Sequence, residues 1–174
     1  MKLNFKHAMF AAALATTAGS AMAYDVRIDV NGKLTSSTCE VTAGSSKQAT
    51  INLPELDVSS LNAAGASSGR KQLDLAVTGC QDTTVAEVHF EPSGVNVTPA
   101  GTLRNLATSE PAANVEVQLL DGQSKVLNLN TDTASYAVSG ATGTVTLYAQ
   151  YYSPQGDAQP GNVTSYIEMS MAYR

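Results

Sequence analysis

The sequence contains no tryptophan, only three phenylalanines and two cysteines, and charged residues make up just 14% of it. The low charge excludes a long charged coiled coil and a highly charged disordered chain. Thirteen glycines in 174 residues are too few for a collagen-like repeat. No segment has the 18 consecutive apolar residues typical of a membrane-spanning helix. The hydrophobic fraction of 43% is ordinary and fits one globular domain with a core.

Residues 1–23 have the features of a secretory signal peptide. A basic start precedes an apolar run over residues 8–15, which is too short to span a bilayer. Small residues then end in an A-x-A cleavage motif at 21–23. We therefore expect an exported protein whose mature chain begins at Tyr24, the alternative being a buried N-terminal helix.

Motifs for catalysis, metal binding and nucleotide binding are missing from the sequence. The mature chain keeps one histidine, His89, and neither a G-x-S-x-G element nor a glycine-rich phosphate-binding loop occurs. The 15 acidic residues outnumber the 10 basic ones, and no basic cluster suits nucleic acid or an anionic membrane. We therefore expect no enzyme, no cofactor and no metal site. Tyr148, Tyr151 and Tyr152 could line a ligand-binding face, although packing within a sheet explains them more simply.

Two cysteines, Cys39 and Cys80, remain in the exported chain. In an oxidising compartment an even pair most simply forms one disulfide. A metal site would need further ligands at short spacing, and neither cysteine has a histidine nearby in sequence. We predict a Cys39–Cys80 disulfide, whose closed loop of about 42 residues would contribute roughly 4 kcal/mol in the chain-entropy model.

The mature sequence predicts short strands separated by turns. Alternating apolar and polar residues, the pattern of a strand with one buried face, recur about every ten residues. Asp121 and Gly122 separate two such runs and predict a hairpin, and residues 58–66 allow a short helical turn. Together these features predict an all-β protein with a β-sandwich fold. The predicted strands cover residues 26–30, 40–42, 50–53, 73–77, 85–90, 115–120, 126–129, 145–152 and 166–173.

The most informative run lies at the start of the mature chain, over residues 24–34. Most domains begin with disordered polar residues, but here one face of the predicted strand is apolar throughout. Such a strand suits an apolar groove of another sheet, where backbone hydrogen bonds give affinity and alternate side chains give specificity. Periodicity alone favours the simpler alternative, an ordinary first strand of the domain's own sandwich. The apolar face carries Val26, Ile28, Val30, Gly32 and Leu34.

The chain ends within another predicted strand. Exposed edge strands usually carry proline or charge, which prevents pairing with other chains. This edge is apolar and lacks that protection, so we expect another chain to cover it. Its apolar positions are Ile167, Met169, Met171 and Tyr173, before the terminal Arg174.

These features resemble the fimbrial subunits of the chaperone–usher pathway, in the class of type 1 pili. The resemblance rests on the alternating segment 26–34 before Cys39, and on a second cysteine that follows an alternating strand. The tail adds Gly161, fourteen residues from the end, and Tyr173 in the next-to-last position. Each motif alone is weak, but together with the signal peptide and the length they are specific.

The resemblance implies a pilin fold over residues 35–174, an incomplete immunoglobulin-like sandwich that lacks its last strand. It implies that a periplasmic chaperone supplies a strand during export. At the outer-membrane usher, the N-terminal extension of the next subunit would replace that strand, with residues 24–34 as the donor. The edge from Ile167 to Arg174 would be where the chaperone pairs, and Cys39–Cys80 would be the family disulfide.

The implied function is a structural subunit of a surface fimbria that polymerises head to tail and contributes to cell adhesion. A sandwich missing a strand leaves an apolar groove that must be covered. A head-to-tail contact that does not close on itself gives an open filament. Two alternatives stay open: a minor adaptor subunit of the fibre tip, and a stand-alone secreted carbohydrate-binding module. The mature chain has no room for the separate receptor-binding domain of a tip adhesin.

Overall fold

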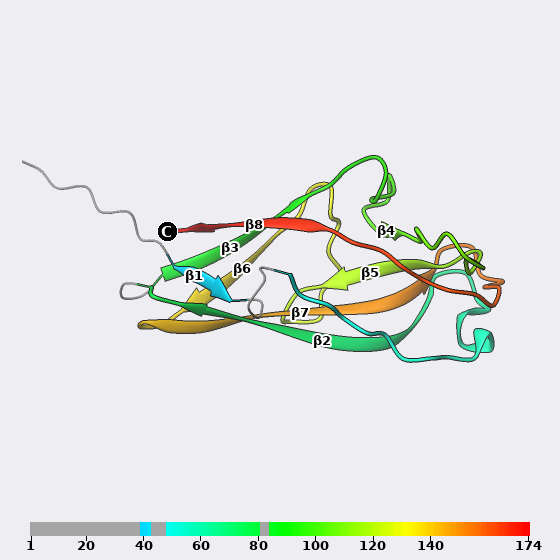
Figure 1. The fold of residues 1–174 in the computed structure, drawn as a ribbon, viewed down its shortest axis with the longest axis horizontal. Helices are drawn as coiled ribbons and strands as arrows, with labels where there is room; N and C mark the ends of the chain where they lie inside the picture. The colour runs from blue at the N-terminus through cyan, green and yellow to red at the C-terminus, as the bar shows by residue number, and fades with distance from the viewer. Residues whose placement is uncertain (1–38, 43–47, 81–83) are drawn as a thin grey trace, which may run out of the picture. The chain divides into compact units, whose positions relative to one another are not determined.

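The computed structural model describes residues 39–42, 48–80 and 84–174 (Figure 1). The predicted signal peptide and the predicted donor strand lie outside these residues. Within the described ranges, no helix is long and apolar enough to cross a membrane. The elements in chain order are β1 (Glu40–Thr42), the 3-10 helix η2 (Val58–Leu61), β2 (Ala66–Thr78), β3 (Thr84–Glu91), β4 (Leu103–Arg104), β5 (Glu116–Leu120), β6 (Thr133–Val138), β7 (Thr142–Ser153) and β8 (Glu168–Tyr173).

Two antiparallel sheets make up the fold. The larger sheet has the strand order β1-β2-β7-β5-β4, and the smaller has the order β6-β3-β8. The longest pairing joins β2 to β7 and runs from Ala66 opposite Ser153 to Thr78 opposite Thr142. The predicted all-β architecture with two sheets is therefore confirmed.

One face of each sheet contributes to a shared core, because side chains alternate along a strand. On β7, Val145, Leu147 and Ala149 are buried, while the residues between them point away from the core. On β3, Ala86 and Val88 have no exposed surface. The core therefore lies between the two sheets, as in a sandwich.

The predicted strand over residues 50–53 is wrong. The backbone of this segment pairs with no described strand. Ile51 and Leu53 are nevertheless half-buried and pack against the main core, as their alternation suggests. Pro54 ends the run and has no N–H to donate to a ladder.

The predicted strand over residues 126–129 is also wrong, although Leu127 and Leu129 are both buried. Leu127 N donates to Leu119 O at 2.9 Å, whereas Leu129 N donates to Gly101 O at 3.0 Å. Because the two bonds reach different segments, no continuous ladder forms. The alternation correctly marked the buried side chains but not the backbone pairing.

The turn predicted at Asp121 is present. Its backbone N donates to Lys125 O at 2.9 Å, and its Oδ1 accepts from the backbone N of Gln123 and of Lys125. The chain reverses here, but the second arm forms only one bridge, between Leu120 and Val126. The turn is therefore present without the full hairpin.

The predicted helical turn corresponds to η2. Asp57 caps it, since its Oδ1 accepts from Ser59 N at 2.8 Å. Hydrogen bonding by the Ser59 side chain, and then by its backbone N, lowers the pKa of the Asp57 carboxyl. Sequence patterning missed β4 and β6 and the first half of β2.

Candidate functional site

The open side of β8 is the candidate site. β8 pairs with β3 along one side, from Ala86 opposite Tyr173 to Glu91 opposite Glu168. Among the described residues, no strand pairs with its other side, and Figure 1 shows β8 at the margin of its sheet. Such an edge presents unpaired backbone N–H and C=O groups, which are a template for another chain.

Six partly buried apolar side chains from two segments pack against the main core. Four lie in β8 or just before it, and two lie in the segment 48–57, whose backbone pairs with no described strand. Because these side chains keep part of their surface in water, a strand added along the open side of β8 would further bury those that β8 carries. We call them the open apolar set: Ile51, Leu53, Ile167, Met169, Met171 and Tyr173.

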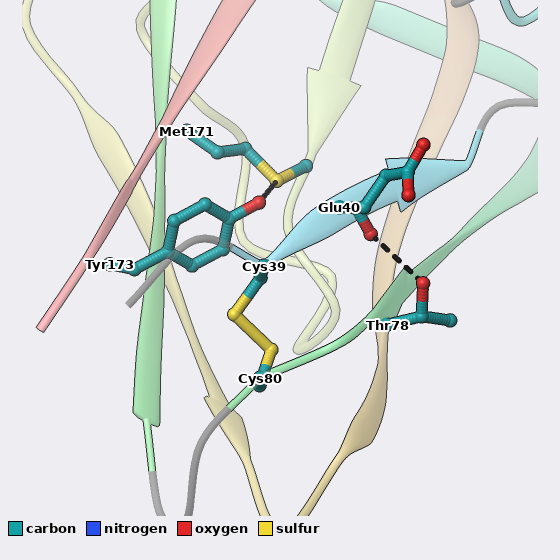
Figure 2. The surroundings of a disulfide bond; sticks show 6 residues. All are labelled: Cys39, Glu40, Thr78, Cys80, Met171 and Tyr173. Carbon is teal, nitrogen blue, oxygen red and sulfur yellow. Dashed lines mark hydrogen bonds between the residues drawn. A yellow bond between two sulfur atoms is a disulfide. The ribbon is translucent and has the colours of Figure 1, made fainter. Parts of the chain in front are cut away.

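The end of the set lies beside the disulfide. Figure 2 shows the side chains of Tyr173 and Met171 next to Cys39 and Cys80. The Tyr173 hydroxyl donates to Met171 Sδ at 3.5 Å, and burial raises the pKa of Tyr173. The last aromatic side chain is partly buried and packs against the main core.

The predicted disulfide between Cys39 and Cys80 is present. It joins the residue before β1 to the segment that follows β2, next to the pairing of Glu40 with Thr78. Thr78 Oγ1 also donates to Glu40 O at 3.5 Å, as Figure 2 shows. The short strand β1 is thus covalently tied to the larger sheet.

Arg174 holds the end of β8 on β3. Its backbone N donates to Val85 O at 3.1 Å, and Val85 N donates back to Arg174 O at 2.7 Å. Its guanidinium lies 2.6 Å from Glu87 Oε1, an ion pair between an exposed arginine and a half-buried carboxylate. All these contacts lie on the β3 side and leave the open side unchanged.

Gly161 allows the segment that leads to β8 to pass close to the backbone of residues 110–112. A Cβ there would lie 2.4 Å from Ala112 N and 2.5 Å from Glu110 O, both backbone atoms. The close approach is fixed by two hydrogen bonds, from Ala112 N to Asn162 O at 2.9 Å and from Asn162 N to Glu110 O at 2.7 Å. Only glycine fits this position without moving the backbone.

The structure brings the predicted C-terminal residues together on one face of β8, while Arg174 lies at its end. The predicted donor residues Val26 to Leu34 lie outside the described residues. Sequence reasoning missed Ile51 and Leu53 as members of the site, although their alternation was visible.

His89 is the one histidine in the described part of the chain. It lies on β3, opposite Ser170 of β8 and Thr133 of β6. No three His, Cys, Asp or Glu side chains gather in that part of the chain in a group that could hold a metal.

Comparison with known proteins identifies the family. The model of the family described as Fimbrial protein matches residues 28–174. The major fimbrial subunit SMF-1 of Stenotrophomonas maltophilia is 34% identical over 169 residues, which cover 92% of this chain and 99% of that protein. The F17 fimbrial protein of Escherichia coli is 33% identical over 184 residues, which cover 99% of both chains.

Solved structures agree on the fold. The P pilus rod subunit PapA superposes with a TM-score of 0.59 at 16% identity, over 78% of this chain and 99% of that one. A subunit in the structure of a chaperone–usher pilus gives the same TM-score at 13% identity, over 85% of this chain and 94% of that one. The two-sheet architecture is therefore the predicted pilin fold. With the matches in sequence, it shows that the chain belongs to the fimbrial protein family.

Proposed function

We propose that this fimbrial subunit polymerises by donor-strand exchange. Its segment 24–34 would complete the sandwich of a neighbouring subunit, and a neighbour's segment would complete its own. The observation that carries the proposal is the open side of β8 together with the open apolar set. One chain then supplies both halves of a head-to-tail contact, which extends into a filament because it does not close.

The donor segment has the side chains that such a contact needs. In an extended strand Val26, Ile28, Val30 and Leu34 would share one face, with Gly32 among them. Burying one such side chain contributes roughly 1.5–3 kcal/mol, so the four give about 6–12 kcal/mol before the cost of ordering the strand. Backbone hydrogen bonds to the open side of β8 would add to this affinity.

The open edge needs a temporary partner before polymerisation, because exposed apolar edges aggregate. We assign that role to a periplasmic chaperone that pairs with β8 beside Met169, Met171 and Tyr173. Arg174 would lie at the end of this pairing. An outer-membrane usher would then exchange the chaperone strand for the donor strand of the next subunit.

The completed fibre would stand on the cell surface and contribute to adhesion. One relative, SMF-1, is named a major fimbrial subunit, which favours a repeating shaft subunit over a minor adaptor of the tip. A structural role rather than an enzymatic one agrees with fimbrial relatives over nearly the whole chain.

A matched pair of variants tests the exchange. Ile28→Asp would put a carboxylate into an apolar contact, at a cost of several kcal/mol. Arg27→Asp places the same carboxylate on the polar face of the donor strand. We expect Ile28→Asp subunits to bind the chaperone but to be absent from shed fibres, while Arg27→Asp subunits assemble normally. Normal fibres built from Ile28→Asp would overturn the proposal.

A further inference from the structure

We propose that the outer face of the larger sheet binds a carboxylate-bearing saccharide at a site centred on Arg70. The residues of this site come from β2, β7 and β5 and alternate with the core residues, so they point away from the core. The surface is separate from the open side of β8. The site forms within one subunit, so it does not depend on strand exchange. In a fibre, each subunit would carry one copy of the site.

A β-bulge places Arg70 on this face. The register of β2 on β7 shifts between Ser68 and Lys71, so Gly69 and Arg70 together oppose Gln150. Gly69 has a φ of 72°, a left-handed conformation that glycine adopts at little cost. Bulges of this kind redirect a side chain and are frequent beside functional sites.

A hydrogen-bonded chain then fixes the guanidinium. Arg70 Nε donates to Gln150 Oε1 at 3.1 Å, and Gln150 Nε2 donates to Gln118 Oε1 at 3.0 Å. The Arg70 guanidinium carbon lies 5.7 Å from the centroid of the Tyr148 ring. Gln150 is only 5% exposed, although it points away from the core. Both polar ends of this buried amide are used, so it orients Arg70 and Gln118 together.

Several donors remain available on this face. Within the part of the chain that the structure describes, the two terminal nitrogens of Arg70 and the Nε2 of Gln118 have no hydrogen-bond partner. Tyr148 and Tyr152 flank Gln150 on β7, and their hydroxyls are likewise without a partner among the described residues. The face therefore offers a guanidinium from Arg70, an amide from Gln118 and two phenol hydroxyls from the tyrosines.

These groups match one ligand chemistry. A guanidinium with two free nitrogens binds a carboxylate in bidentate fashion. Amide and phenol groups suit sugar hydroxyls, and tyrosine rings give amphipathic contact area. Sialic acids and uronic acids both supply a carboxylate on a polyhydroxylated ring, and that shared chemistry is what the site would recognise.

The charge of Arg70 is free for a ligand. No ion pair joins it to a carboxylate within the described ranges, whereas Arg174 and Lys125 have Glu87 and Asp132 as partners.

Two carboxylates on the same face, Asp74 and Glu116, accept hydrogen bonds from neutral side chains and form no ion pair with Arg70 among the described residues. Asp74 accepts from Thr146 Oγ1 at 2.7 Å and from Gln72, and these hydrogen bonds lower its pKa. Glu116 accepts from the Thr102 hydroxyl.

The test measures retention of labelled sugars on purified shed fibres. The probes are 3′-sialyllactose and digalacturonate, which distinguish the two acids, with lactose as the neutral control. We expect at least one acidic probe to bind wild-type fibres and lactose not to bind. Arg70→Gln should lower that retention at least tenfold, and Gln118→Glu should do the same by placing a carboxylate beside Arg70.

Arg104→Gln is the matched control, because Arg104 is exposed on β4 and forms no ion pair among the described residues. Its fibres should retain the probe as wild type does. Absence of binding by both acidic probes, equal binding of lactose, or equal losses in Arg70→Gln and Arg104→Gln would each overturn the proposal. A change of fibre width in Arg70→Gln, with sugar binding unchanged, would also overturn it and would instead identify the face as a contact between copies of this chain.

Discussion

Replacing Gly161 with alanine tests what holds the entry to β8. The new Cβ would meet backbone atoms of Ala112 and Glu110 at 2.4 and 2.5 Å. Because backbone atoms cannot rotate away, the two segments must separate and strain both hydrogen bonds made by Asn162. Two weakened bonds together with residual backbone strain give a loss of about 2–5 kcal/mol in the free energy of unfolding.

The assay is urea denaturation of purified fibres followed by circular dichroism, together with immunoblots of the periplasmic subunit. With a denaturant slope of about 2 kcal/mol/M, the midpoint should fall by about 1–2.5 M. Subunit abundance should fall several-fold, since less stable subunits are degraded.

Gly94→Ala is the matched control for this experiment. A Cβ at Gly94 meets no atom within 4 Å, so its effect should stay within about 0.5 kcal/mol. Equal midpoints for Gly161→Ala and Gly94→Ala would refute the reasoning from close approach.

Three further changes have definite expected outcomes. Deleting Tyr173 and Arg174 removes the end of the edge, so co-purification with the chaperone should be lost; unchanged recovery would contradict its role. Cys39→Ser removes the disulfide, which contributes about 4 kcal/mol to the free energy of unfolding in the chain-entropy model, so periplasmic subunit levels should fall sharply. Wild-type levels would count against the disulfide's importance. Burial raises the pKa of Tyr136 to about 12 from 10, so stability should be complete below pH 10 and decline between pH 10 and 12. Tyr136→Phe should flatten that decline in a pH series of unfolding curves, and an unaltered slope would exclude Tyr136 as its source.

Alternation in the sequence predicted buried side chains better than it predicted backbone pairing. Leu127 and Leu129 are buried as expected, yet their hydrogen bonds reach two different segments. Ile51 and Leu53 face the core, yet no described strand pairs with their backbone. Pairing depends on which chain lies alongside, and a periodic pattern does not contain that information.

The missed elements have physical reasons as well. The first half of β2 is rich in serine and glycine, and it is a strand because it pairs with β7 across a bulge. Its polar composition therefore hid both the strand and the position of Arg70. In β6, Ala134, Tyr136 and Val138 are buried, but the small alanine made the alternation weak.

The candidate site was predictable in part. The apolar alternation at Met169, Met171 and Tyr173 is enough to identify the edge from the sequence alone. The sequence does not show why residue 161 must be glycine. The requirement comes from the close backbone of residues 110–112, which is far away along the chain.

The central claim is that subunits join without covalent bonds through the N-terminal strand. The most direct measurement is a denaturing gel of shed surface material, unheated and boiled, from wild type and from a deletion of residues 24–30. Strand exchange predicts a ladder in the unheated wild type that collapses to monomer on boiling and is absent in the deletion. A single band at the monomer mass in every lane would contradict it and would favour a stand-alone exported sandwich.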